Sequence, residues 1–157
     1  MTATAHALVA GAIAARFGDP ILAPILAFTS HFIMDAVPHW DIGTNWRSRS
    51  KSTTGALAII DTVLGITVAY FLFIGKAPLI PLLLAVFFSL LHDWLETPWY
   101  ILFDHQKKHE PGKKAGFWEN LAFSVYKLEN SCHTKAEFPI GALTQLATVA
   151  FFLILLR

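Results

Sequence analysis

The sequence predicts an all-α membrane protein, a single integral domain over residues 1–157 that forms a bundle of about five transmembrane helices. Hydrophobic residues make up 55% of the chain and charged residues only 15%, whereas about a quarter of an ordinary soluble domain is charged. The mean hydropathy of +0.52 agrees with this composition. The apolar residues gather in five segments, 3–17, 20–36, 54–74, 77–98 and 138–156. The first is short for a hydrocarbon core and could enter only part of it, whereas the others are near the length that crosses one.

The connections between these segments predict two helical hairpins followed by a C-terminal helix. "GDP" at 18–20 and "GKAP" at 75–78 are short breaks of the kind that Gly and Pro introduce between helices. The connections 37–53 and 104–137 are longer. The second contains "KKAGFWENLAFSVYKLEN", whose apolar spacing predicts an amphipathic helix at the membrane surface.

The positions of Lys and Arg predict the orientation. Nine of the 12 basic residues fall in the two long connections, and cytoplasmic loops carry an excess of positive charge. Both connections and the N-terminus are therefore expected in the cytoplasm of a prokaryotic inner membrane. Membrane lipid is the partner that this pattern predicts, because basic loops attract anionic lipid. Nucleic acid is not expected as a partner, and oligomer formation stays open.

Ionisable side chains interrupt the apolar segments, where an unpaired carboxylate costs about 2.5–3.5 kcal/mol. In "SHFIMDAVP" and "LLHDWLETP", His31 and Asp35 and likewise His92 and Glu96 stand four residues apart. Each pair therefore shares one face of its helix. Two further ionisable residues lie in the segments before these, at the same leaflet in this topology. The sequence predicts that one site gathers His6, His31, Asp35, Asp61, His92 and Glu96.

The two hairpins also end alike. "HFIMDAVPHW" and "HDWLETPWY" each contain a His, three residues, a carboxylate, and then Pro and an aromatic residue. A parallel duplication and a chance match of two short stretches both explain this likeness.

The predicted ligands indicate a divalent metal. A mixture of imidazole and carboxylate suits Zn²⁺ best, with Mn²⁺ and Fe²⁺ as alternatives. Cys132 is the single cysteine, which disfavours a thiolate cluster. Six ligands exceed the four that one zinc ion takes, so one to three ions are expected. Two-metal sites recur in enzymes that hydrolyse phosphate esters.

Other ionisable residues lie close to the predicted ligands. His39 and Asp41, just beyond Pro38, stand where a substrate would arrive, although helix-end or interface roles would also explain them. Together with Asp93 they are predicted to orient a water or to transfer protons. His105 and His109 lie among lysines, which favours a solvated role. The role of His133 is left open, although it could reach the site from its loop.

Two resemblances point the same way. "MTATAHALVAGA" and "SHFIMDAVP" resemble parts of a bacterial family of small inner-membrane proteins that are described as metal-dependent hydrolases. An N-terminal His and a membrane-embedded His-x-x-x-Asp recur in that family, and His6, His31 and Asp35 match them. The family's "HRGxTHS" element does not occur in this chain.

The second resemblance is one of pattern. Zinc-dependent phospholipases C and their nuclease relatives are helical proteins that hold zinc with His-x-x-x-Asp, His-x-x-x-Glu and further His and Asp residues. His31 with Asp35 and His92 with Glu96 are similar to those two elements.

These observations favour a membrane-embedded, metal-dependent hydrolase that cleaves a phosphoester, such as a lipid head group, at the cytoplasmic leaflet. Four alternatives use the same residues. An ion or proton transporter would employ them as a relay, and an electron carrier would ligate haem through the histidines. A metal-binding membrane protein without catalysis is the third, and a hydrogen-bonded core that only packs the helices is the fourth.

Overall fold

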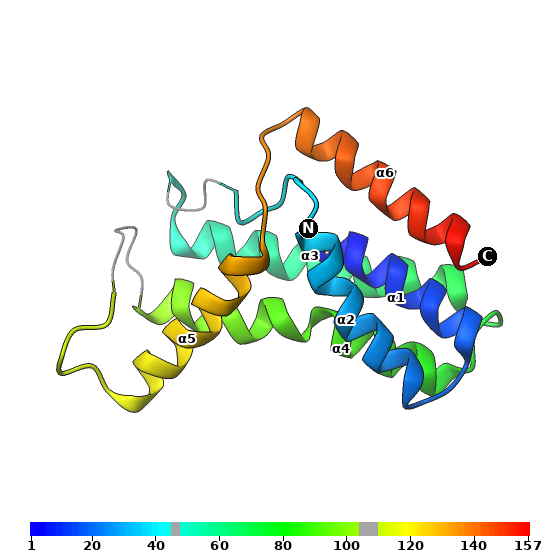
Figure 1. Ribbon diagram of the computed structural model, residues 1–157, viewed down its shortest axis with the longest axis horizontal. Coiled ribbons are helices and arrows are strands. Elements are labelled where there is room, and N and C mark those ends of the chain that lie inside the picture. The colour runs from blue at the N-terminus through cyan, green and yellow to red at the C-terminus, as the bar shows by residue number, and fades with distance from the viewer. Residues whose placement is uncertain (45–47, 104–109) are drawn as a thin grey trace.

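The computed structural model describes residues 1–44, 48–103 and 110–157. Within these ranges the chain is helical and contains no strand, which confirms the all-α prediction (Figure 1). The elements are α1 (Ala3–Phe17), α2 (Leu22–Asp35), α3 (Lys51–Phe73), α4 (Leu79–Pro98) with the π-helical turn η2 (Trp99–Phe103), α5 (Phe117–Cys132) and α6 (Ile140–Leu155).

Each predicted apolar segment carries one helix, and α5 lies in the amphipathic stretch of the long connection. Two helices are long and apolar enough to cross a membrane, namely α3 and the continuous helix Leu79–Phe103. The other apolar helices, α1, α2 and α6, are shorter. A place for α5 at the membrane surface stays a prediction.

The central helix is α1, which packs against α2, α3, α4 and α6. Small residues on α1 and α3 allow this close packing. At Gly65 of α3, a Cβ atom would lie 2.9 Å from Cα of Thr4. At Gly11 of α1, a Cβ atom would lie 2.3 Å from the ring of Phe73. The two helices therefore run in the same direction with their backbones close together.

This register leaves half of the second hairpin uncovered. Because Thr4 lies against Gly65 and Gly11 against Phe73, α1 begins beside the middle of α3 and continues to its end. Figure 1 shows the α1–α2 hairpin beside only one half of α3 and α4. The other halves project past it toward α5, and α3 and α4 contact each other much less than α1 and α2 do.

Beyond α5 the chain returns to the end of α2. The amide of Thr134 donates to the carbonyl of Asp35 at 2.8 Å, and the amide of His39 donates to the carbonyl of Thr134 at 3.1 Å. The amide of Ala136 donates to the carbonyl of His39 at 2.7 Å. These bonds join two segments that are far apart in the sequence and place the residue after α5 beside the end of α2.

Candidate metal centre

Four imidazoles surround the carboxylate of Asp35, a buried residue at the end of α2. The Nε2 atoms of His6 and His31 lie 3.1 and 3.2 Å from its two oxygens. The Nε2 of His39 lies 3.6 Å from Oδ1. The Nδ1 of His133 lies 3.5 Å from Oδ2. Asp35 is therefore the middle of a cluster that draws on α1, α2 and both long connections.

Helix geometry positions the first part of this cluster. His31 and Asp35 are one turn apart on α2, so their side chains share a face. His6 comes from α1, and its ring stacks on that of His31 with the centroids 3.9 Å apart. Small neighbours on α1 bring the two helices close enough for this stacking.

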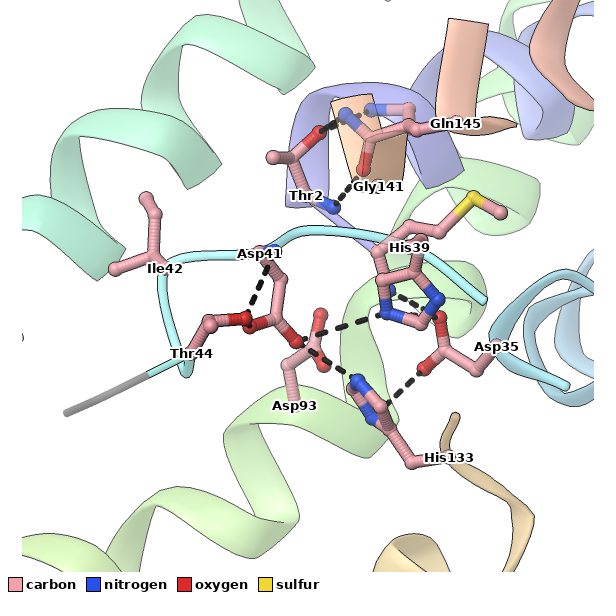
Figure 2. Close-up of polar contacts among 12 residues, drawn as sticks. Thr2, Asp35, His39, Asp41, Ile42, Thr44, Asp93, His133, Gly141 and Gln145 are labelled. Atoms are coloured by element: carbon pink, nitrogen blue, oxygen red, sulfur yellow. Dashed lines mark hydrogen bonds and ion pairs between the residues drawn. The ribbon is translucent and has the colours of Figure 1, made fainter. Parts of the chain in front are cut away.

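The return of the chain after α5 positions the second part. His39 and His133 lie on the two segments that the main-chain bonds join, and their ring centroids are 4.5 Å apart. Figure 2 shows Asp35, His39, Asp41 and His133 turned toward one another, with Asp93 beside them. The Nε2 of His133 lies 2.8 Å from Oδ2 of Asp41.

Two of the imidazoles are held by backbone carbonyls. The Nδ1 of His31 lies 2.7 Å from the carbonyl oxygen of Ser89, and the Nδ1 of His39 lies 2.7 Å from that of Val37. Because a carbonyl only accepts, each Nδ1 carries the proton, and each Nε2 faces the carboxylate of Asp35. A far nitrogen that donates to a carbonyl is the usual arrangement of a metal-bound histidine.

The Nε2 of His39 gives the clearest fit to a cation. It is buried and has no hydrogen-bond partner among the residues that the structure describes. It nevertheless lies 3.6 Å from an oxygen of Asp35 and 3.6 Å from an oxygen of Asp41. A metal ion placed among these three atoms would satisfy the lone pair of the nitrogen and both carboxylates.

Two groups of three ligands can hold a metal ion. One consists of His6, His31 and Asp35, and the other consists of Asp35, His39 and His133. Within each group the ligand atoms lie within 4.8 Å of one another. Asp35 belongs to both groups, so its two oxygens could bridge a pair of ions.

Asp41 and His133 are in the protonation states that bind metal. Burial alone would raise the pKa of the Asp41 carboxyl, but the neighbouring imidazoles of His133 and His39, with Lys135 nearby, hold that pKa well below its ordinary value. Burial lowers the pKa of His133 although Asp41 acts against this. An ionised carboxylate and a neutral imidazole result, and metal ligation requires both.

The structure brings together five of the residues predicted for the site, namely His6, His31, Asp35, His39 and Asp41. It also places Oδ1 of Asp93 3.8 Å from the Nε2 of His31. His39, predicted to be catalytic, lies here as a potential ligand.

Asp61 lies away from these ligand groups and caps α1. Its carboxylate accepts from the amide of Ala3 at 2.7 Å and from the amide and hydroxyl of Thr4 at 3.2 and 2.7 Å. A carboxylate at this position stabilises the first turn of a helix. The contacts of Asp61 in this structure are therefore those of a cap.

His92 and Glu96 lie on the same helix, α4, but their side chains contact different residues. The ring of His92 stacks on His31 at 4.5 Å and tilts over Phe28 at 3.9 Å. Glu96 accepts a hydrogen bond from the hydroxyl of Tyr100. Neither belongs to the two ligand groups, so the second hairpin does not repeat the ligand arrangement of the first.

Sequence reasoning did not assign His133 or Glu129. His133 is a potential ligand. Glu129 is a buried residue of α5, and burial raises the pKa of its carboxyl group to about 7. Both lie near the end of α5 with no spacing signal that links them to α2. His105 and His109 lie outside the described residues.

A cavity of about 170 Å³ opens directly beside the centre. Asp41, Asp93 and His133 form part of its wall. The remainder comes mainly from the halves of α3 and α4 that the first hairpin leaves uncovered. The ligand cluster therefore borders a space that a small group could enter.

The chain has no match among protein-family models, curated proteins or solved structures. The two resemblances seen in the sequence stay predictions.

Proposed function

We propose that the protein is a membrane-embedded, metal-dependent hydrolase that cleaves a phosphoester with a metal-activated water. The observation that supports this is the cavity beside the ligand cluster, with Asp41, Asp93 and His133 in its wall. Structural zinc sites are closed by four protein ligands, whereas catalytic sites keep a position open for water or substrate. The position of this cluster favours the second type.

The donor set favours zinc as the metal. Imidazole nitrogens and carboxylate oxygens, without thiolates, are common at catalytic zinc sites, and Mn²⁺ or Fe²⁺ would also fit. The two ligand groups that share Asp35 favour two ions. Bound metal lowers the pKa of a water to about 7 and polarises a phosphoryl oxygen.

Residues of the chain would bind the metal, accept a proton and position the ligands. His6, His31, His39 and His133 would hold the metal, with Asp35 between the ions. Asp93, which lies at the cavity, would accept a proton from the attacking water. Asp41 would hold His133 in position through the contact at 2.8 Å.

The surface of α3 supports a place in the membrane. This helix is 23 residues long, and only Gly65 and Ala69 are buried. A soluble protein rarely exposes so large an apolar face, but a lipid bilayer solvates it at no cost. The distribution of basic residues then favours an orientation with both long connections in the cytoplasm.

Metal analysis of the purified, detergent-solubilised protein tests this proposal together with hydrolysis of bis(p-nitrophenyl) phosphate. We expect about two zinc equivalents and turnover that 1,10-phenanthroline abolishes. Asp35→Asn should remove most of the metal and the activity, and His133→Ala should remove about one equivalent. Glu137→Ala is the matched control, since Glu137 is an exposed carboxylate just after His133.

Two results would overturn the proposal. Metal content that is unchanged in Asp35→Asn and His133→Ala would exclude this cluster as the binding site. Stoichiometric metal with no turnover, together with metal flux in proteoliposomes, would instead support transport.

A further inference from the structure

The wall of the cavity beside the metal centre includes exposed apolar side chains of two helices. Gly55, Ala58 and Ile59 of α3 form one wall, and Trp94 and Thr97 of α4 with Ile101 of η2 form the other. Ile59, Trp94 and Ile101 are 53%, 41% and 38% exposed. The cavity therefore continues onto the apolar outer surface of the two helices that are long enough to cross a membrane.

The polar end of the cavity suits an anion once metal is bound. Asp61 and Glu96 also line it, but the start of α1 and the hydroxyl of Tyr100 already donate to their carboxylates. Lys135 also lines the cavity, near the ionised carboxylate of Asp41. Its ammonium and the metal ions would together attract a phosphate group.

The volume of the cavity limits what it can enclose. A dry apolar cavity of about 150 Å³ is known to hold a benzene ring, so about 170 Å³ takes a short stretch of hydrocarbon. The rest of a long chain would lie against the exposed apolar faces of α3 and α4. A molecule with an anionic head and a hydrocarbon tail matches both ends of this space.

Gly55 is the wall residue that packing does not explain. Glycine destabilises a helix interior relative to alanine, yet a Cβ atom at Gly55 would meet nothing within 4 Å. Gly65 on the same helix differs, since a Cβ atom there would lie 2.9 Å from the backbone of Thr4. The missing side chain at position 55 leaves space in the cavity instead of allowing helix contact.

We propose that the space between α3 and α4 binds the acyl chain of a lipid substrate that enters from the bilayer, and that Gly55 determines whether the chain fits. The head group would then lie at Asp41, His133 and Lys135. The identity of the head-group end rests on the proposed hydrolase function, whereas the acyl-chain site does not.

Photo-crosslinking tests this site without relying on turnover. The metal-loaded protein is placed in phosphatidylcholine vesicles that contain phosphatidic acid with a diazirine near the glycerol end of one acyl chain. After irradiation, peptide mapping should find the crosslinks at 54–62 of α3 and at 94–101 of α4 and η2. Gly55→Phe should reduce them tenfold or more, and Lys135→Gln should reduce them several-fold.

Ala56→Phe is the matched control, because Ala56 is the exposed neighbour on the same helix and does not line the cavity. It should keep the crosslinks, and both phenylalanine variants should keep their metal. If Gly55→Phe does not accumulate, Ala58→Leu on the same wall provides the test.

The outcomes separate this inference from the proposed function. Crosslinks that Gly55→Phe abolishes support the acyl-chain site even if no phosphoester is hydrolysed. Crosslinks that spread equally over α6, or that Gly55→Phe leaves unchanged, overturn the site even if the protein proves to be a hydrolase.

Discussion

Among single residues, Asp35 has more nitrogen neighbours than an ion pair requires. One protonated imidazole would neutralise its charge, but four imidazoles lie within 3.6 Å of its oxygens. Backbone carbonyls fix the protons of His31 and His39 on the far side of each ring. The N-terminal ammonium of Met1 also forms an ion pair with Oδ1 of Asp35, so a metal ion bound to that oxygen would compete with this ammonium.

The tautomers of His31 and His39 are the first prediction. With metal bound, ¹⁵N spectra of histidine-labelled protein should show a protonated Nδ1 and a metal-shifted Nε2 at both residues, because each Nδ1 donates to a carbonyl. Chelation should move the Nε2 signals and leave the Nδ1 signals in place. Signals are assigned with His31→Gln and His39→Gln, and a protonated Nε2 at His39 in the loaded protein would contradict the arrangement.

Asp61→Ala is the second prediction. Removing the cap of α1 should lower the free energy of unfolding by about 1–2 kcal/mol, the usual cost of a lost cap. Metal content should stay the same, since Asp61 accepts from Ala3 and Thr4. Thermal unfolding in detergent and metal analysis measure the two effects. A fall in metal content at unchanged stability would restore Asp61 as a ligand.

Spacing in the sequence predicts which side chains share a helix face, but it cannot predict the other members of the cluster, for a physical reason. The i,i+4 rule shows that two side chains share a helix face, which holds for His31 with Asp35 and for His92 with Glu96. It does not show what that face meets. The face of α2 meets His6 and the returning chain, whereas Glu96 meets Tyr100. His133 reaches Asp35 only through tertiary pairing of two connections.

Among the helices, the fold depends on how closely α1 approaches α3. Small residues on both helices permit the approach, and the register follows from Gly65 against Thr4. Hydropathy predicted where these helices lie, because apolar length is a property of the sequence. It could not predict that α1 begins at the middle of α3, since that depends on the shape of both surfaces.

Alanine at two positions of α3 provides the third prediction. Gly65→Ala should cost about 1–3 kcal/mol, because its Cβ would push against the backbone of Thr4. Gly55→Ala should stabilise the same helix by about 0.5–1 kcal/mol, because its Cβ meets nothing. Reversible unfolding of both variants in the same detergent measures the difference. Equal effects at the two positions would contradict the register of α1 on α3.

For the molecule as a whole, the proposed arrangement places a centre that is rich in carboxylates and imidazoles at the cytoplasmic leaflet of the membrane. The uncovered halves of α3 and α4 lie on the side of the long connections, where most basic residues stand. Substrate would therefore come from the cytoplasmic leaflet, and the same face would meet anionic lipid.

Cysteine accessibility provides the fourth prediction and tests this orientation. In a Cys132→Ser background, Gly112→Cys lies in the long connection and Lys76→Cys in the turn between α3 and α4, both at exposed positions. A membrane-impermeant maleimide should label Gly112→Cys in inside-out vesicles and Lys76→Cys in intact spheroplasts. Labelling of both variants from one side would exclude the proposed topology.

The main-chain bonds that join Thr134 to Asp35 and His39 also set an order of events during synthesis. The ribosome delivers His6, His31 and Asp35 first, so one three-ligand group is complete once the first hairpin has formed. His133 emerges only after α5, and closing so long a loop carries a larger entropic cost. Under the proposed two-ion arrangement, a nascent chain could hold one ion early, whereas the second would bind only after nearly all of the protein has been translated.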